Sequence, residues 1–178
     1  MIKPIMQVPE HDIFSKNTSL RNRSAEVIEF NDELRAVLRD LVDTMNVHDI
    51  AIGLSAPQIG INIRVAVINV SEGKREPNIV IINPRDIVIS GKKDKKKESC
   101  MSIPHFRGEV ERRHAIAFTY DDESGKPQHM SATGFLARVL SHEIDHLDGI
   151  LYVDRMVDPK ALEPVDFFRK DAKAGSTS

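Results

Sequence analysis

A five-residue run late in the chain combines residue types that can bind and use a metal ion. It reads His142-Glu143-Ile144-Asp145-His146. Histidines four positions apart lie on one face of a helix, so both imidazoles can reach a single ion. The glutamate between them can accept a proton from a water molecule at the metal. Two unliganded histidines would be costly to bury on this apolar stripe. We therefore predict His142 and His146 as ligands and Glu143 as the general base.

A catalytic metal of this kind needs a third protein ligand and an open position for water. In the metzincin pattern a glycine and then a third histidine follow the second histidine. Gly149 fits that pattern, but Tyr152 stands where the third histidine should be, which excludes it. A carboxylate from a later segment is another source of the ligand, as in a general zinc protease. Glu163 is the candidate for that role, and Asp154 and Asp158 are further possibilities.

Cys100 is the remaining candidate for the third ligand and the single cysteine of the chain. A lone cysteine is commonly a small buried apolar residue. Its neighbours Ser99, Ser102 and Pro104 suit a turn or an edge better than the middle of a core strand. A thiolate ligand would account for this cysteine without redox chemistry. One cysteine also excludes an internal disulfide and favours a reducing compartment.

A third segment, residues 51–60, is rich in glycine and alanine and contains Gln58. Small residues allow close approach of another backbone, and Gln58 offers a neutral amide donor. A plain connector between a helix and a strand would suit the same composition, so both interpretations stay open at this point.

Composition indicates an ordinary globular chain. Its 178 residues are 40% hydrophobic and 29% charged, with a formal charge of −2, and they suit one domain over residues 1–169 and a mobile tail over 170–178. The charge favours neither DNA nor a membrane as partner. No secretion signal or membrane-length apolar run is evident, so we expect a cytoplasmic protein. We expect the lysine-rich run at 92–97 to be a solvated loop, with contact to RNA or a ribosomal surface as the alternative.

Periodicity predicts two helices separated by strands. Apolar residues three and four apart mark a helix from Asp32 to about Met45, with Asn31 as N-cap. A second helix should run from about Ala132 to Leu147, with Ser131 or Thr133 as cap. Short strands are expected at Arg64 to Val70, Asn78 to Ile82, Ile87 to Ser90, Ala115 to Tyr120 and Gln128 to Ser131, with breaks at Asn83-Pro84 and Gly91. This order predicts an α+β fold: mainly antiparallel β-sheets packed around the helix that carries the His-Glu-x-x-His motif, with an amphipathic helix in the N-terminal half.

Taken together, the three motifs resemble the peptide deformylase family. They are the glycine-and-alanine loop that ends in Gln58, the Glu-x-Cys-x-Ser segment around Cys100, and the His-Glu-x-x-His helix, in the order of the family. The resemblance runs from about Pro9 to Asp154. The chain departs from the usual family residues at Ala51, Ser55, Ser99 and Ser141, none of which is a predicted ligand or the base.

The resemblance implies a catalytic set. Cys100, His142 and His146 would bind the ion, with water in the fourth position, and Glu143 would act as base. Gln58 and the backbone N–H of Met101 would donate to the oxygen that becomes negative during hydrolysis of the formyl group. The family usually carries iron(II), while zinc, nickel or cobalt would also suit these ligands.

The resemblance also implies a substrate and partners. The substrate would be a nascent N-formyl-methionyl peptide, met in transient contact with the ribosome. Its backbone would pair with Ile52 and Gly53 as an added strand, and its methionine would contact Phe135 and Val139 beside Met101. Arg107 would help to hold the peptide. A deformylase-like protein that binds formyl-peptides or ribosomes without turnover is the alternative, suggested by Ser99 beside the metal cysteine.

Overall fold

The structure, a computed structural model, describes residues 1–48, 51–70 and 79–165. Within these ranges an antiparallel sheet has the strand order β1-β2-β3-β4-β5, and β6 pairs with β4. The strands are β1 Gly53–Ser55, β2 Val65–Ile68, β3 Ile79–Cys100, β4 Ile103–Asp121, β5 Pro127–Thr133 and β6 Glu163–Pro164. The α-helices are α1 Asp32–Asn46 and α2 Gly134–Leu147, and short 3₁₀ turns occur at Glu10–Asp12, Ser19–Arg21, Ala56–Ile59 and Tyr152–Arg155. The expected α+β class is therefore confirmed.

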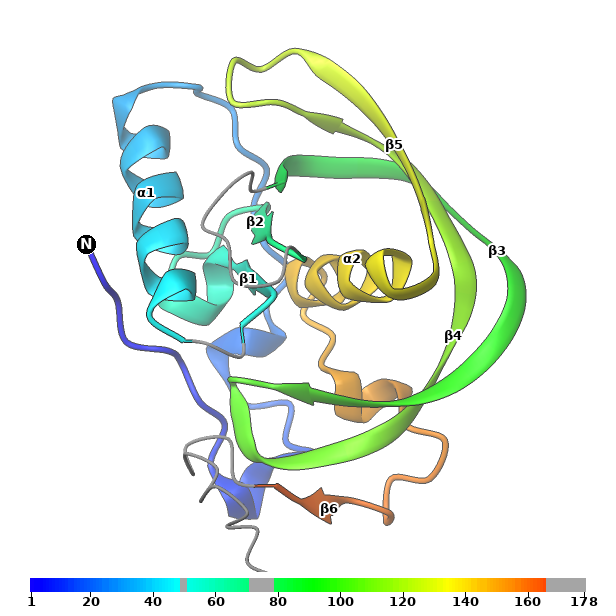
Figure 1. The fold of residues 1–178 in the computed structure, drawn as a ribbon. Helices are drawn as coiled ribbons and strands as arrows, with labels where there is room; N and C mark the ends of the chain where they lie inside the picture. The colour runs from blue at the N-terminus through cyan, green and yellow to red at the C-terminus, as the bar shows by residue number, and fades with distance from the viewer. Residues whose placement is uncertain (49–50, 71–78, 166–178) are drawn as a thin grey trace, which may run out of the picture.

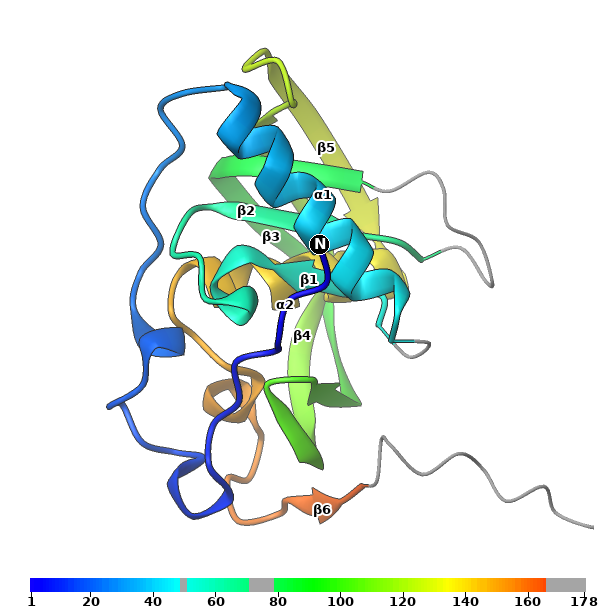
Figure 2. The same cartoon turned by 90° about the vertical axis from the view of Figure 1, so that its left-hand side faces the viewer.

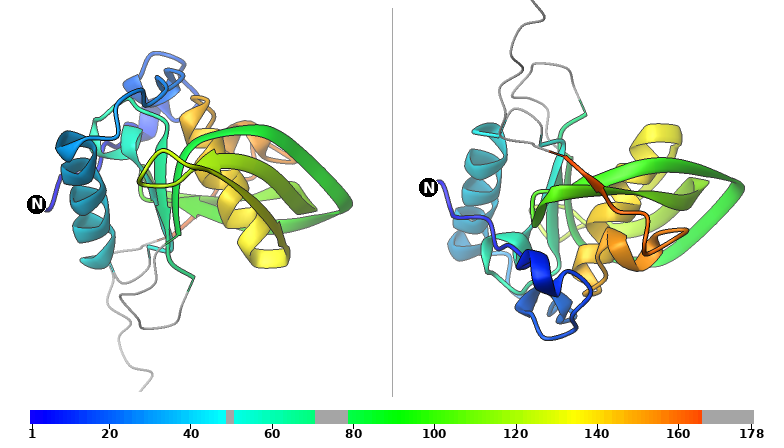
Figure 3. Two further views of the ribbon diagram at one scale, coloured as in Figure 1. Left: turned by 90° about the horizontal axis from the view of Figure 1, so that it is seen from above. Right: turned by 90° about the horizontal axis from the view of Figure 1, so that it is seen from below.

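Helix α1 covers β1 and β2 from one side, opposite to α2 (Figure 3). Its buried stripe includes Leu34, Leu38, Leu41 and Met45, spaced three or four residues apart as one helix face requires. The side chain of Asn31 accepts hydrogen bonds from the N–H groups at positions 33 and 34, both at 3.1 Å. The predicted helix and its cap are therefore confirmed.

Helix α2 lies in the hollow of the curved sheet, where the long β3 and β4 strands and β5 bend around it (Figures 1 and 2). It packs against β4, β5, β1 and β2. Because it is covered on several sides, most of its residues are buried, including the polar Ser141, Glu143 and His146. The motif helix is thus held from several directions, and its polar side chains are removed from bulk water.

Strand β3 differs from the prediction, which ended one strand at Asn83-Pro84 and another at Gly91. The structure continues through both sites as one strand with shifts of register near each. Asn83 and Gly91 have positive φ angles of 50° and 80°, and β-bulges accommodate such residues without ending a strand. The Asn83 amide also bonds to the backbone N–H and C=O of Val27, both at 2.8 Å, which stabilises this conformation. Residue 78, the expected start of the strand that was predicted to end at Asn83-Pro84, lies outside the described residues.

The lysine-rich run at 92–97 was expected to be a loop, and that expectation is wrong. These residues belong to β3, and residues 93–97 pair with the stretch of β4 from Glu109 to Arg113. Their lysines are nevertheless exposed. Lys93 Nζ lies 2.6 Å from Glu111 Oε1, so charges on the partner strand help to hold the lysines in extended structure.

Two further boundaries differ from the prediction, and one open interpretation is decided. Gly53–Ser55 forms β1, so the plain-connector interpretation of residues 51–60 does not hold for these three residues. Strand β4 begins at Ile103, well before the expected Ala115. Ala132 belongs to β5, so α2 begins two residues later than predicted, and Thr133 occupies the N-cap position without a side-chain cap bond. No helix in the described parts of the chain is both long and apolar enough to cross a membrane. The tail expected from residue 170 lies outside the described residues.

Candidate metal centre and active site

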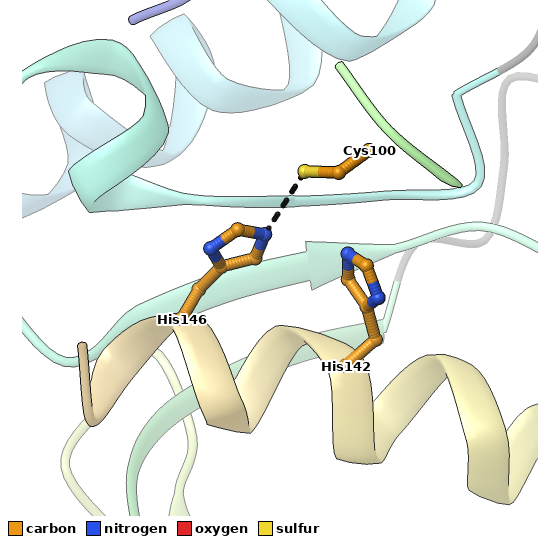
Figure 4. Close-up of side chains that lie close together, drawn as sticks. All are labelled: Cys100, His142 and His146. Atoms are coloured by element: carbon orange, nitrogen blue, oxygen red, sulfur yellow. Dashed lines mark hydrogen bonds between the residues drawn. The ribbon is translucent and has the colours of Figure 1, made fainter. Parts of the chain in front are cut away.

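Helix α2 and the end of β3 bring three metal-ligating side chains together. His142 and His146 stand one helical turn apart, with ring centroids 5.0 Å from each other. Both rings point from α2 toward Cys100 (Figure 4). Cys100 Sγ lies 3.2 Å from His146 Nε2. One ligand atom from each residue falls within a group whose members are all within 4.8 Å of one another. The structure therefore assembles the predicted set from segments 46 residues apart.

The donor set fits a catalytic metal ion. Burial alone would raise the pKa of the Cys100 thiol, but the imidazoles of His146 and His142 hold that pKa well below its usual value. A thiolate and two imidazoles are the ligands that zinc and divalent iron, cobalt and nickel accept. Three protein ligands leave a position for water. Beside these three residues, Glu143 Oε2 is buried with no hydrogen-bond partner in the described part of the structure. A buried oxygen without a partner is unusual in a folded protein, and it is able to accept a proton from a water molecule.

A buried carboxylate, Glu98, fixes the orientation of His142. Arg112 bonds to both oxygens of Glu98 at 2.6 and 3.0 Å, and Arg138 donates to Oε1 at 2.7 Å. Burial favours the neutral acid, yet hydrogen bonds from His142 and Arg112 hold the pKa of Glu98 well below its usual value. The ionised carboxylate can only accept, so His142 Nδ1, 3.1 Å away, carries the proton. Nε2 is therefore the ring nitrogen of His142 that would bind an ion.

Gln58 reaches the cluster from the 3₁₀ turn that follows β1. Its Nε2 donates to Cys100 Sγ at 3.3 Å and to Ser102 Oγ at 3.2 Å. Its Oε1 accepts from the backbone N–H and the hydroxyl of Ser55, both at 2.9 Å. Because Ser55 donates both hydrogen bonds to the side-chain oxygen of Gln58, the N–H₂ group of the same amide faces Cys100. Ser55, which departs from the usual family residue, thus helps to orient a donor in the site.

Glu143 is held between α2 and β1. Its side chain is 4% exposed. Burial raises the pKa of Glu143 above its usual value, although His142 and His146 act in the opposite direction. Its carboxylate packs on the backbone of Gly53, where an added Cβ would lie 2.5 Å from Oε1. The absence of a side chain at Gly53 is therefore what allows this position of the carboxylate.

A cavity of about 230 Å³ opens on this cluster. Of the predicted site residues, those that line it are Ile52, Gly53, Gln58, Cys100, Met101, Phe135, Val139, His142 and Glu143. Phe135 and Ile52 are 55% and 38% exposed, so apolar surface is open to a ligand here. His146 lies behind the lining, at 1% exposure.

Arg107 and the three rival carboxylate ligands are not among the described residues that line the cavity. Arg107 instead donates from Nε to Glu163 Oε2 at 3.1 Å. Glu163, on β6, also bonds to Lys97. Asp154 pairs with Arg21, and the Asp158 side chain accepts from a backbone N–H two residues on. Cys100, and neither Glu163 nor an aspartate, is thus the residue found with the two histidines among the described residues.

The sequence interpretation missed the polar groups behind the ligands. The sequence predicted Glu98 only as the first residue of the Glu-x-Cys-x-Ser segment and predicted no role for the arginines that bind it. A signal did exist for Arg138, which lies four residues before His142 on the same helix face. A buried charge at that spacing indicates a partner near the first ligand. Arg112 gave no such signal, because it comes from a distant strand.

Comparison with known proteins decides the family. The family model described as polypeptide deformylase matches residues 2–161. The chain belongs to the peptide deformylase family. Peptide deformylase 2 of Gloeobacter violaceus is 40% identical over 146 residues, which cover 82% of this chain and 78% of that protein. The peptide deformylase of Brucella suis is 37% identical over 171 residues, 95% of this chain and 93% of that one.

Solved structures of the family agree. The peptide deformylase of Synechococcus elongatus in complex with actinonin superposes with a TM-score of 0.77 at 37% identity, over 88% of this chain and 79% of that one. The Thermotoga maritima peptide deformylase gives 0.76 at 30% identity, over 89% and 99% of the two chains. This chain is therefore a metal-dependent hydrolase that removes the N-formyl group from formylated nascent peptides.

Proposed function

We propose that this deformylase carries out its reaction with Cys100, His142 and His146 as metal ligands and Glu143 as the proton carrier. The observation that supports this assignment is the buried cluster of the three ligand atoms beside the unpartnered Glu143 Oε2. When bound, the ion acts as a Lewis acid that makes water nucleophilic near neutral pH. Iron(II) is the proposed physiological ion, and zinc, nickel or cobalt suit the same ligands.

The protein's own groups then account for the proton movements. Glu143 takes a proton from the attacking water, whose oxygen bonds to the formyl carbon. The Gln58 amide and the Met101 N–H donate to the formyl oxygen as negative charge develops there. One such donor is typically worth roughly 3 kcal/mol of barrier. Glu143 passes its proton to the leaving nitrogen as the C–N bond breaks, so the products are formate and a free peptide amine.

The cavity supports a mode of peptide binding. Strand β1 pairs with β2 along one edge. No other strand of the described residues pairs with its second edge, and we assign the peptide backbone to Ile52 and Gly53 there. The methionine side chain would contact Phe135, Val139 and Met101, which line the cavity. Arg107 is kept as a contact for the more distant part of the peptide. A cytoplasmic location and transient contact with the ribosome follow from the nascent substrate and belong to the proposal.

The test is formate release from N-formyl-Met-Ala-Ser by iron(II)-loaded protein without oxygen, beside Glu143→Gln. The variant should bind the metal but lose at least about 100-fold in kcat, because a general base contributes 10² to 10⁴ in rate. Glu33→Gln, an exposed change on α1, is the matched control and should behave as wild type. A Glu143→Gln protein with more than a tenth of wild-type kcat would contradict the role of Glu143.

The competing function is that of a protein that binds formyl-peptides without hydrolysing them. Ser99 is the residue that suggests this alternative. Ser99 lines the cavity, yet both the ligand cluster and the base are assembled with this residue in place. We therefore expect Ser99→Gly to change kcat/KM by less than about threefold. A gain of tenfold or more would mean that the natural residue suppresses turnover.

A further inference from the structure

Two cationic side chains, Lys97 in the cavity lining and Arg107 outside it, share the carboxylate of Glu163 on β6. Lys97, on β3, lines the cavity, and its Nζ lies 2.7 Å from Glu163 Oε1. Arg107 Nε lies 3.1 Å from Glu163 Oε2. The side chains of Lys97, Arg107 and Glu163 are 49%, 44% and 44% exposed. The pairs are therefore accessible to water and to a ligand.

Strand register explains why these three residues meet next to the metal cysteine. Arg107 is the register partner of Ser99 on one side and of Glu163 on the other. Residues directly opposite each other project to the same face of a sheet. Lys97 lies two residues from Ser99 and therefore shares that face. Lys97 thus continues the wall that Ser99 begins, and Arg107 lies beyond the wall on the same face of the sheet.

Lys97 differs from the other charged residues that line the cavity. Glu98 and Arg138 are buried and bonded to each other, and Glu143 is the buried base. Among these four charged lining residues, Lys97 is the exposed one, at 49%. Glu109 is its register partner on β4, but the Lys97 ammonium bonds to Glu163 instead. The exposed charged residue in the cavity lining is therefore a cation, and its partner Glu163 lies outside the lining.

We propose that Lys97, with Arg107, forms a binding site for a carboxylate of the peptide substrate, which Glu163 occupies when no such peptide is bound. The inference rests on the proposed function and deepens it, since it names a substrate class: formyl-methionyl peptides with an acidic residue shortly after the methionine. An acidic side chain of the peptide replaces Glu163 as the partner of Lys97 and Arg107. A basic side chain at the same place is repelled by these two cations.

The distance along β3 from Cys100 to Lys97 indicates that the third residue of the peptide would reach this cationic site. Lys97 precedes Cys100 by three residues, which is roughly 10 Å of extended chain. A peptide whose formyl group lies at the ligand cluster covers that length in about three residues. Exchange of one exposed ion pair for another has a small effect. We therefore expect a two- to fivefold preference, within the range measured for exposed pairs.

The experiment compares peptides of the form formyl-Met-Ala-Xaa-Ala-amide, where Xaa is Glu, Gln or Lys. The metal-loaded wild type should show a kcat/KM for the Glu peptide about two to five times that for the Lys peptide, mainly through KM. Lys97→Gln should bring this ratio close to one. Glu163→Gln should raise it about twofold, because the competing carboxylate is removed. Lys93→Gln is the matched control: it is an exposed lysine of the same strand, paired with Glu111, and should leave the ratio unchanged.

The Gln peptide separates this inference from the proposed function. No cleavage of the Gln peptide would overturn both together. Cleavage of the Gln peptide with equal rates for Glu and Lys would overturn the carboxylate site alone. A preference that persists in Lys97→Gln, or that falls equally in Lys93→Gln, would also overturn it. A true ionic preference must in addition shrink as salt rises, since exposed charges are screened over about 10 Å at 0.1 M salt.

Discussion

Replacement of Gly53 by alanine tests whether the position of the Glu143 carboxylate controls the rate. Gly53 lies in β1, and an alanine Cβ there would stand 2.5 Å from Glu143 Oε1 and 2.9 Å from Cδ and Cγ. Atoms do not approach so closely, and ordinary contact begins near 3.4 Å. The carboxylate must therefore retreat, or β1 must move away from α2.

The size of the effect follows from that distance. The carboxylate oxygen has to shift by about 0.9 Å, and a misplacement of roughly 1 Å can cost about 100-fold in rate. The peptide-pairing N–H and C=O of residue 53 remain in the alanine variant. We therefore expect Gly53→Ala to lower kcat about 100-fold with a smaller change in KM.

The assay is deformylation of N-formyl-Met-Ala-Ser, with metal content and melting temperature measured on the same samples. Gly108→Ala is the matched control, because it also adds a methyl group to a strand glycine. There the new Cβ meets the flexible end of Met156 instead of the base. A Gly53→Ala enzyme with full metal content and a kcat within threefold of wild type would refute the reasoning.

Three further predictions concern positioning and stability. Glu98→Gln removes the ionised acceptor that orients His142 and should weaken metal affinity 10- to 100-fold in a chelator competition, whereas unchanged affinity would mean that the imidazole needs no such partner. Asn31→Ala deletes the cap of α1 and should lower the free energy of unfolding by about 1 kcal/mol in urea without affecting kcat; an equal stability would show that the two 3.1 Å bonds contribute nothing net. At Asp154, burial raises the pKa, but Lys16, a backbone N–H and Arg21 lower it more, so the folded pKa lies below 3.8. The carboxylate therefore stabilises the fold above pH 3.8 and loses that contribution as the pH falls through the lower folded value. Asp154→Asn should cost about 1 kcal/mol at pH 7, with the gap to wild type closing on acidification, and a gap independent of pH would contradict this.

Local patterns in the sequence determined the helices and the nature of the site. The stripe from Leu34 to Met45 and the cap at Asn31 both depend on neighbours within four residues, and the structure confirms them. The spacing of His142 and His146 likewise places both rings on one face before any tertiary contact forms. The sequence predicts such features correctly because they depend on the helix alone and not on tertiary contacts.

Turn signals were less reliable, because their outcome depends on a partner strand. Asn83-Pro84 and Gly91 are typical of chain breaks, yet both lie inside β3, where pairing with β4 continues around bulges. The lysine run at 92–97 became strand for the same reason. Pairing with a strand many residues away outweighed local preference at each of these sites.

Tertiary structure decided which candidate ligand lies beside the two histidines and which polar groups stand behind them. From the residues alone, Cys100 and Glu163 remained rival ligands, and the neighbours of Cys100 together with the resemblance favoured the cysteine. The fold places Cys100 beside His146, and it places Glu163 on β6 with Lys97 and Arg107. Sequence spacing cannot reveal such contacts, because they join segments 46 and 56 or more residues apart through the packing of the sheet around α2. The sequence by itself therefore determined which chemistry the chain carries, and the tertiary structure decided which residues stand together to perform it.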